Sequence, residues 1–258
     1  MTRSWIVFAA LAIACGARSE LRTASGAPSD AAPPEITPDF AWYKLDETSG
    51  DVAHDSGPNH WDVWITNVTW DDDGAVFDGA TTCGEVNVAE SFRQPPVTIS
   101  AWLTPAARDD QASNAYALTP FPPDAVSGDY PVEGGYGLGL DVWTDGGGGH
   151  ALSVETGYGT ATAFHSMSGA FAAGDRHFLA VVIGSADATI FVDGKQTTQT
   201  SDDIAPSVTP TPLHLGCHND DGGYGTKRFY KGHMRDVRVF KRILGADEIA
   251  QLFANGPA

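Results

Sequence analysis

Apolar and polar residues alternate in short runs along most of the chain, and this alternation predicts β-strands. Val97–Leu103 (VTISAWL) is rich in β-branched residues and contains no Gly or Pro. Phe178–Ile183 (FLAVVI) is apolar at every position, which is typical of a central strand that is buried on both faces. After Thr189–Val192, the dipeptide Asp193-Gly194 favours a two-residue hairpin turn.

One segment, Ala246–Ala254, has the period of an α-helix instead. Its residues Ile249, Leu252 and Phe253 fall on one helical face, and two acidic residues stand in the first turn. The tripeptide Asn255-Gly256-Pro257 predicts where this helix ends. Together these patterns predict an all-β protein with one short C-terminal helix.

The first residues are typical of an export signal. Trp5–Ala14 is an apolar run of ten residues, which is too short to span a bilayer. A small residue directly before Cys15 resembles a bacterial lipobox, in which the cysteine becomes the lipidated first residue. Lipoboxes usually carry Leu where this chain has Ala12, so soluble secretion is the alternative. We expect a signal peptide over residues 1–14 and lipidation at Cys15.

The residues that follow predict a tether and then one folded domain. Residues 15–37 are rich in Ala, Ser, Gly and Pro and contain few large apolar side chains, so they cannot bury enough surface to fold. Residues 38–258 are expected to form a single domain held away from a membrane. The protein is therefore expected at the outer surface of the cell envelope as a lipoprotein or, alternatively, in secreted form.

Composition and charge narrow the choice of partners. The chain contains 29 Gly and 16 Pro, as expected for short strands joined by tight turns. Its formal net charge of −18 excludes nucleic acid as a partner, since phosphate contacts need Lys and Arg in excess. The same charge disfavours attraction to anionic lipids, so membrane contact is expected only through the N-terminal lipid. Hard cations such as Ca²⁺ are compatible with this charge.

Several short motifs occur along the domain in a characteristic order. They are Tyr43–Asn59 (YKLDE through DSGPN), Val76–Gly79 (VFDG), Val97–Trp102 (VTISAW), Ile190–Lys195 (IFVDGK), Leu213–Gly216 (LHLG), Gly232–Phe240 (GHMRDVRVF) and Leu244–Ile249 (Leu244 with DEI). In this order they resemble the laminin-G-like domains of the concanavalin A-like lectin/glucanase superfamily. The resemblance implies a jelly-roll sandwich of two antiparallel sheets.

Hydrolytic chemistry is not predicted. Retaining glucanases of this superfamily use two carboxylates about 5 Å apart, a spacing that neighbours on the same face of one strand supply. No such pair is found, since Glu85 and Glu90 are five residues apart and point to opposite faces. His214 and His218 are expected on a strand and a loop and do not predict a zinc pair. We expect a protein that is not an enzyme, with a glycoside hydrolase or lyase as the less favoured alternative.

Acidic residues at one corner predict a structural calcium ion. The resemblance places the loop that contains Asp55 and Asn59 near the terminal strand that carries Asp236, and calcium is common at that corner of such domains. Carboxylate and amide oxygens are the ligands that Ca²⁺ prefers. Asp55 and Asp236 are the expected side-chain ligands, with Asn59 as a further candidate. The alternative is that these residues are ordinary members of a surface with 33 Asp and Glu.

Two cysteines remain once Cys15 is assigned to processing, and the resemblance does not account for them. Cys83 and Cys217 stand in or beside predicted strands. An exported protein folds in an oxidising compartment, which favours a disulfide between them. Two separate buried thiols are the alternative.

Aromatic residues in the segments between strands predict the ligand. Sandwich domains often bind sugars through flat ring faces together with a few polar groups. Tyr130, Trp143 and Tyr224 are the stacking candidates, with Asn219 and Asp220 as polar partners. The expected partner is a polysaccharide or glycan, recognised without catalysis. The alternative is a protein–protein adhesion domain that binds a surface protein.

Overall fold

The computed structural model describes residues 35–86, 96–106, 114–119, 138–144, 150–158, 161–171, 174–184, 187–200, 213–218 and 228–258. All of these except Glu35 belong to one compact unit, Ile36–Ala258. The predicted signal peptide (residues 1–14), Cys15 and nearly all of the predicted tether lie outside the described residues, and so these remain predictions.

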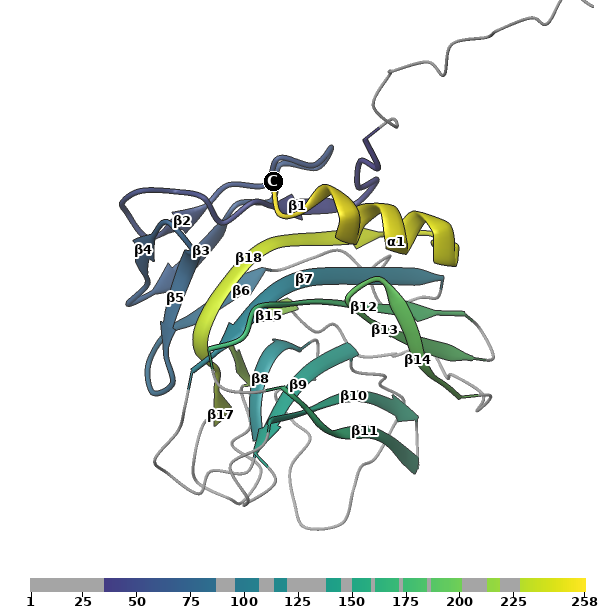
Figure 1. Ribbon diagram of the computed structural model, residues 1–258. Helices are drawn as coiled ribbons and strands as arrows, with labels where there is room; N and C mark the ends of the chain where they lie inside the picture. The colour runs from purple at the N-terminus through teal and green to yellow at the C-terminus, as the bar shows by residue number, and fades with distance from the viewer. Residues whose placement is uncertain are drawn as a thin grey trace, which may run out of the picture. The chain divides into compact units, whose positions relative to one another are not determined.

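Among the described residues, two antiparallel eight-stranded sheets pack against each other (Figure 1). The first, sheet A, has the spatial order β14 (Lys195–Thr200), β13 (Ala188–Val192), β12 (His177–Ile183), β7 (Val97–Pro105), β18 (Lys231–Phe240), β5 (Gly74–Asp78) and β4 (Thr69–Asp71), with β1 (Ala41–Tyr43) paired to β18. The second, sheet B, has the order β11 (Ala161–Phe171), β10 (His150–Tyr158), β9 (Leu138–Thr144), β8 (Asn114–Thr119), β15 (Leu213–Leu215), β6 (Cys83–Val86), β3 (Val63–Thr66) and β2 (Val52–Ala53). A separate two-stranded ribbon pairs β16 (Cys217–His218) with β17 (Arg228–Phe229). This architecture confirms the predicted jelly-roll sandwich.

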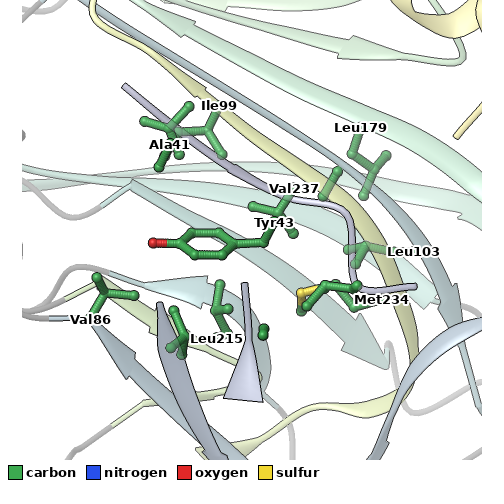
Figure 2. Packing of buried hydrophobic residues seen from close by; sticks show 14 of the residues in the cluster. Ala41, Tyr43, Val86, Ile99, Leu103, Leu179, Leu215, Met234 and Val237 are labelled. Atoms are coloured by element: carbon green, nitrogen blue, oxygen red, sulfur yellow. The ribbon is translucent and has the colours of Figure 1, made fainter. Parts of the chain in front are cut away.

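The core between the sheets follows from the alternation of side chains along each strand. In β7, Val97, Ile99, Ala101 and Leu103 belong to the apolar cluster between the sheets. Tyr43 lies in the same cluster, and its ring packs among residues from both sheets (Figure 2). The residues around it are Ala41, Ile99, Leu103, Leu179, Met234 and Val237 from sheet A, and Val86 and Leu215 from sheet B. Burying one of the valine, leucine, isoleucine or methionine side chains of this cluster stabilises the fold by about 1.5–3 kcal/mol.

The outer face of sheet A is covered by the helix α1 (Ala246–Asn255), as Figure 1 shows. Ile249 and Leu252 are buried against Trp102 and Phe178, whose side chains point away from the core between the sheets. The ring of Phe253 stacks on Trp102 with 5.7 Å between the ring centroids. The helix and its apolar face were predicted from the sequence and are confirmed. In the part of the chain that the structure describes, no helix is both long and apolar enough to cross a bilayer.

Local turn chemistry also agrees with the sequence. β13 and β14 form a hairpin in which Asp193 and Gly194 both have positive φ, at 49° and 73°. Such angles are those of a type I′ turn, for which Asp-Gly is among the preferred dipeptides. The Asp193 carboxylate also accepts a hydrogen bond of 3.0 Å from the backbone N–H of Phe178. The hairpin is therefore tied to β12, which lies between β13 and β7 as expected for a central strand.

Cys83 of β6 and Cys217 of β16 form a disulfide, as predicted, with their Cα atoms 5.2 Å apart. The bond joins positions separated by 134 residues. It ties sheet B to the two-stranded ribbon, close to the point where β15 ends.

Candidate functional site

The ligand contacts predicted from the sequence lie largely outside the described residues. This applies to Tyr130, Asn219, Asp220 and Tyr224. Trp143 lies in β9, where it is paired in register with Asn114 and Ala151, and its side chain is outside the description. These five assignments therefore stay predictions.

The outer face of sheet B presents a tryptophan to solvent. In β3, Val63 and Ile65 are completely buried, whereas Trp64 and Thr66, which alternate with them along the strand, are exposed. Trp64 has 62% of its surface exposed, and it and Ile243 are the exposed large apolar residues of the described part of the chain. Strand alternation explains this position, because residues two apart share a face and their neighbours fill the core.

Trp64 belongs to a row of side chains that crosses sheet B, and its register partner on β2 is the half-buried Val52. Trp64 is the register partner of Glu85 on β6, and Glu85 is the register partner of His214 on β15. Directly opposed residues on antiparallel strands have Cβ atoms about 5 Å apart. The row therefore sets an indole, a carboxylate and an imidazole side by side over about 10 Å.

Exposure changes sharply along this row. The Glu85 side chain is 51% exposed, whereas that of His214 is only 2% exposed. The closest Glu85 oxygen lies 3.8 Å from Nε2 of His214, which is beyond hydrogen-bond length. Trp64 and Glu85 therefore form the accessible part of the row, and His214 forms its buried end.

A second carboxylate lies close to Trp64 along the chain, just before β3 begins. Asp62 is two residues before Trp64 and is also exposed. Its Oδ2 lies 2.9 Å from Nδ1 of His54, and its Oδ1 accepts a hydrogen bond of 2.9 Å from the backbone N–H of Asp55. The backbone hydrogen bond, together with the one from His54, lowers the pKa of Asp62 below its usual value. Asp62 is therefore ionised at neutral pH, and two carboxylates flank the indole.

The residues predicted to bind calcium meet at Trp42. The backbone N–H of Trp42 donates to Oδ1 of Asp55 at 2.8 Å, and its indole N–H donates to Oδ1 of Asp236 at 2.6 Å. Asp55 and Asp236 thus lie close together, at the corner where the sequence places them. Asn59 lies nearby, and its amide nitrogen donates to the carbonyl of Phe40 at 2.8 Å.

The remaining contacts of these carboxylates come from N–H groups of the protein. Asp55 also accepts from the backbone N–H groups of Gly57 and Trp61, at 2.7 and 2.9 Å. Asp236 accepts from Nε and Nη2 of Arg238 at 2.8 and 3.0 Å, and the Arg238 guanidinium lies 4.5 Å from the centre of the Trp42 ring. These contacts join β1 to β18 and to the loop that follows β2.

These hydrogen bonds occupy oxygens that a cation would need. Among the residues that the structure describes, no group of three or more His, Cys, Asp or Glu side chains is arranged to hold a metal ion. A calcium ion at this corner would have to replace N–H donors on Asp55 or Asp236. The calcium site stays a prediction.

A comparison with models of protein families identifies the family of this chain. The laminin G model described as the concanavalin A-like lectin/glucanases superfamily matches residues 78–250. The chain belongs to this family. Glu85 and His214 lie within the matched region, and Trp64 lies before it. The family name covers both lectins and glucanases, so the site must decide between binding and hydrolysis.

Solved structures share the fold at low sequence identity. A sialidase from Trypanosoma rangeli in complex with sialic acid aligns with a TM-score of 0.60 and 18% identity, over 86% of this chain and 33% of the sialidase. The receptor-binding domain of botulinum neurotoxin type G aligns with a TM-score of 0.55 and 12% identity, over 85% of this chain and 51% of that domain. The chain thus spans about a third and about half of their lengths. No curated protein sequence matches the chain significantly.

The sequence analysis missed the Trp64 row. Aromatic candidates were sought between strands, whereas Trp64 lies within one. A signal was present in Val63-Trp64-Ile65-Thr66, where a tryptophan occupies a position that shares a face with Thr66 rather than with the aliphatic residues. The pairing of Glu85 with His214 depends on sheet order, which a local pattern does not contain.

Proposed function

We propose that this domain binds carbohydrate without catalysis and that the sugar contacts the outer face of sheet B at Trp64. The exposure of Trp64 on a regular strand carries the proposal. An indole left in water forgoes the favourable burial available to so large a ring, which is understandable where a ligand covers it. Flat aromatic faces of this kind stack on the apolar faces of sugar rings.

The surroundings of Trp64 favour a sugar over a protein partner. A protein-binding surface would be expected to present a contiguous apolar patch of several hundred Å². The described neighbours of Trp64 on its own face are one half-buried apolar residue, Val52, and the polar residues Asp62, Thr66 and Glu85. Their oxygens can accept hydrogen bonds from sugar hydroxyls while the indole stacks.

The ligand contacts predicted from the sequence extend this proposal. Trp143 belongs to β9 of the same sheet as Trp64. Tyr130, Asn219, Asp220 and Tyr224 are kept as further candidate contacts. Together with Trp64, a ring from this set would give a polysaccharide two stacking points on one domain.

A binding screen with two matched variants tests the proposal. The wild-type protein is applied to a broad glycan array, and its best ligand is titrated calorimetrically into Trp64→Ala and Ile243→Ala. Loss of a stacking ring is expected to weaken binding about tenfold or more. Ile243→Ala removes the other exposed large apolar side chain and should bind as the wild type does. Equal affinity in both variants would show that the sugar binds elsewhere on the domain. Capture of a surface protein without any glycan binding would favour the adhesion alternative.

We further propose export with a lipid anchor at Cys15. The disulfide between Cys83 and Cys217 supports export, since such bonds persist in oxidising compartments. Cys15→Ser is expected to release the protein from the membrane fraction, because no acyl chain can be attached. Mass spectrometry of the mature N-terminus gives the direct measurement. A wild-type N-terminus without an acyl group would leave soluble secretion as the alternative.

A further inference from the structure

We infer that the Trp64 face selects a saccharide that carries free ammonium groups, such as an oligomer of glucosamine. This inference rests on the proposed function and specifies the charge of the sugar that binds. The observation behind it is the pairing of one exposed indole with two exposed carboxylates, Glu85 and Asp62, on the same face.

The two carboxylates approach the indole from different directions. Glu85 is the cross-strand partner of Trp64, so their Cβ atoms are about 5 Å apart. Asp62 stands two residues earlier, just before β3 begins, which in extended backbone corresponds to about 7 Å. A ligand group stacked over the indole therefore has a negative oxygen within reach both across the sheet and along the strand.

A cation satisfies this arrangement better than a neutral or an anionic group does. An ammonium group within about 6 Å of an indole centre is attracted by the electrons of the ring, and tryptophan is the strongest partner among the aromatic side chains. The same group can donate hydrogen bonds to carboxylate oxygens. A sugar carboxylate at this position would be repelled by Glu85 and Asp62 and could not accept a hydrogen bond from either when they are ionised.

His54 and His214 affect the two carboxylates differently, and Glu85 is the carboxylate that we expect to bind most of the ligand's ammonium group. His54 is bonded to Asp62 and offsets its charge when the imidazole is protonated. His214 lies 3.8 Å from the nearest Glu85 oxygen, so it can also offset the charge of Glu85 when it is protonated, but no hydrogen bond between these two atoms occupies that oxygen. The net charge of −18 adds a long-range attraction for a polycationic chain.

The test uses one sugar backbone in two charge states. The full chain is titrated with a glucosamine hexamer, with the N-acetylglucosamine hexamer of the same linkage, and with an oligogalacturonate. Mildly acidic buffer keeps the amines protonated and the carboxylates ionised. The glucosamine hexamer is expected to bind about tenfold more tightly than its acetylated form, and the oligogalacturonate is expected to bind most weakly.

Three variants show which side chains produce the preference for the glucosamine hexamer. Glu85→Gln is expected to remove most of the preference for the glucosamine hexamer while retaining binding of the acetylated hexamer. Asp247→Asn removes the same charge from the exposed first turn of α1 and is expected to leave the preference unchanged. Trp64→Ala is expected to weaken binding of both hexamers.

The outcomes separate the two claims. Equal affinity for the two hexamers, tighter binding of the oligogalacturonate, or a preference that survives Glu85→Gln would overturn the ammonium inference. Trp64-dependent binding of any of these sugars would leave the proposed function standing. If none of the three saccharides binds and the glycan array is also blank, both claims fail. Binding of polylysine without binding of the glucosamine hexamer would overturn the saccharide assignment.

Discussion

Each of the two sheets carries a tryptophan on its outer face, and the two residues have opposite surroundings. Trp102 of sheet A is 9% exposed because α1 lies over it and Phe253 stacks on its ring. Trp64 of sheet B is 62% exposed, and one of its two cross-strand neighbours is a carboxylate, Glu85. The chain covers one outer face with its own helix and leaves an indole open on the other. The first face therefore contributes to stability, and the second is available to a ligand.

The sheets also differ in how distant parts of the chain are tied to them. Sheet A is held from outside by the apolar face of α1, through Ile249 and Leu252. In sheet B, β6 is joined covalently to β16 by the disulfide between Cys83 and Cys217. On β6, Glu85 keeps about half of its side chain exposed.

Removing the disulfide is expected to have the largest effect on stability. The double variant Cys83→Ser, Cys217→Ser releases a constraint between positions 134 residues apart. The chain-entropy model gives about 5 kcal/mol for a loop of this length, as an upper value. Urea unfolding with and without reductant measures the loss. Reductant should destabilise the wild type and leave the double variant unchanged, and a wild type that is insensitive to reductant while unfolded would contradict the assignment.

The two tryptophans should respond very differently to the same substitution. Trp102→Ala is expected to cost about 3–5 kcal/mol of unfolding free energy, because it opens a cavity beneath α1. Trp64→Ala should change the unfolding free energy by about 1 kcal/mol or less, because most of the side chain is already in water and its packing is limited to cross-strand neighbours such as Val52. Denaturant unfolding of both variants gives the comparison. A large loss in Trp64→Ala would show that this indole serves the fold rather than a ligand.

A smaller effect is expected at the turn that links the sheets, where Asp78 ends β5 and Cys83 begins β6. Burial would raise the pKa of Asp78, but hydrogen bonds from the Thr81 hydroxyl and the N–H groups of Ala80, Thr81 and Thr82 outweigh it and hold the pKa well below its usual value. A lowered folded-state pKa stabilises the fold above the unfolded value of about 3.9, and this contribution is lost as the pH falls towards the folded-state value.

Urea unfolding of the wild type and Asp78→Asn at several pH values tests this effect. Because Asp78 is exposed, solvent screening reduces the expected difference to about 1 kcal/mol or less at neutral pH. The difference should shrink as the pH falls below about 4. Parallel pH profiles for the two proteins would show that the charge of Asp78 does not contribute.

The smallest effect is expected from chelation of calcium. Asp55 and Asp236 already accept hydrogen bonds from N–H groups of the protein. If these donors stay in place, excess chelator should leave Tm unchanged. A fall in Tm that added calcium reverses would instead support the calcium site predicted from the sequence, since a ligand that binds only the folded state stabilises it.

Much of the fold could be predicted because its signals are local. The alternation of Val97–Leu103, the hairpin dipeptide Asp193-Gly194 and the helical period after Ala246 each depend on a few adjacent residues. The disulfide followed from the number of cysteines and the expected compartment. The family motifs then supplied the sheet architecture that these local signals lack.

The candidate site was harder to predict because it is built across strands. Trp64, Glu85 and His214 are spread over 150 positions of the chain and meet only through the order β3, β6, β15. Asp236 shows the same limit, because its partners depend on a register shift in β18 between Arg235 and Arg238. Its position near Asp55 was foreseen, whereas the use of its oxygens by Arg238 and Trp42 was not.

The position of β18 bears on how the protein is made. This strand lies between β5 and β7 and also pairs with β1, and 194 positions separate Trp42 from Asp236, to which its indole is bonded. Contacts between residues so far apart in sequence form slowly, because closing a long loop costs entropy before any bond is made. A nascent chain that has not reached β18 lacks the strand that joins β5 to β7. Sheet A therefore cannot form completely until nearly the whole domain has been synthesised, and an unfolded chain of this kind is what the proposed export would require.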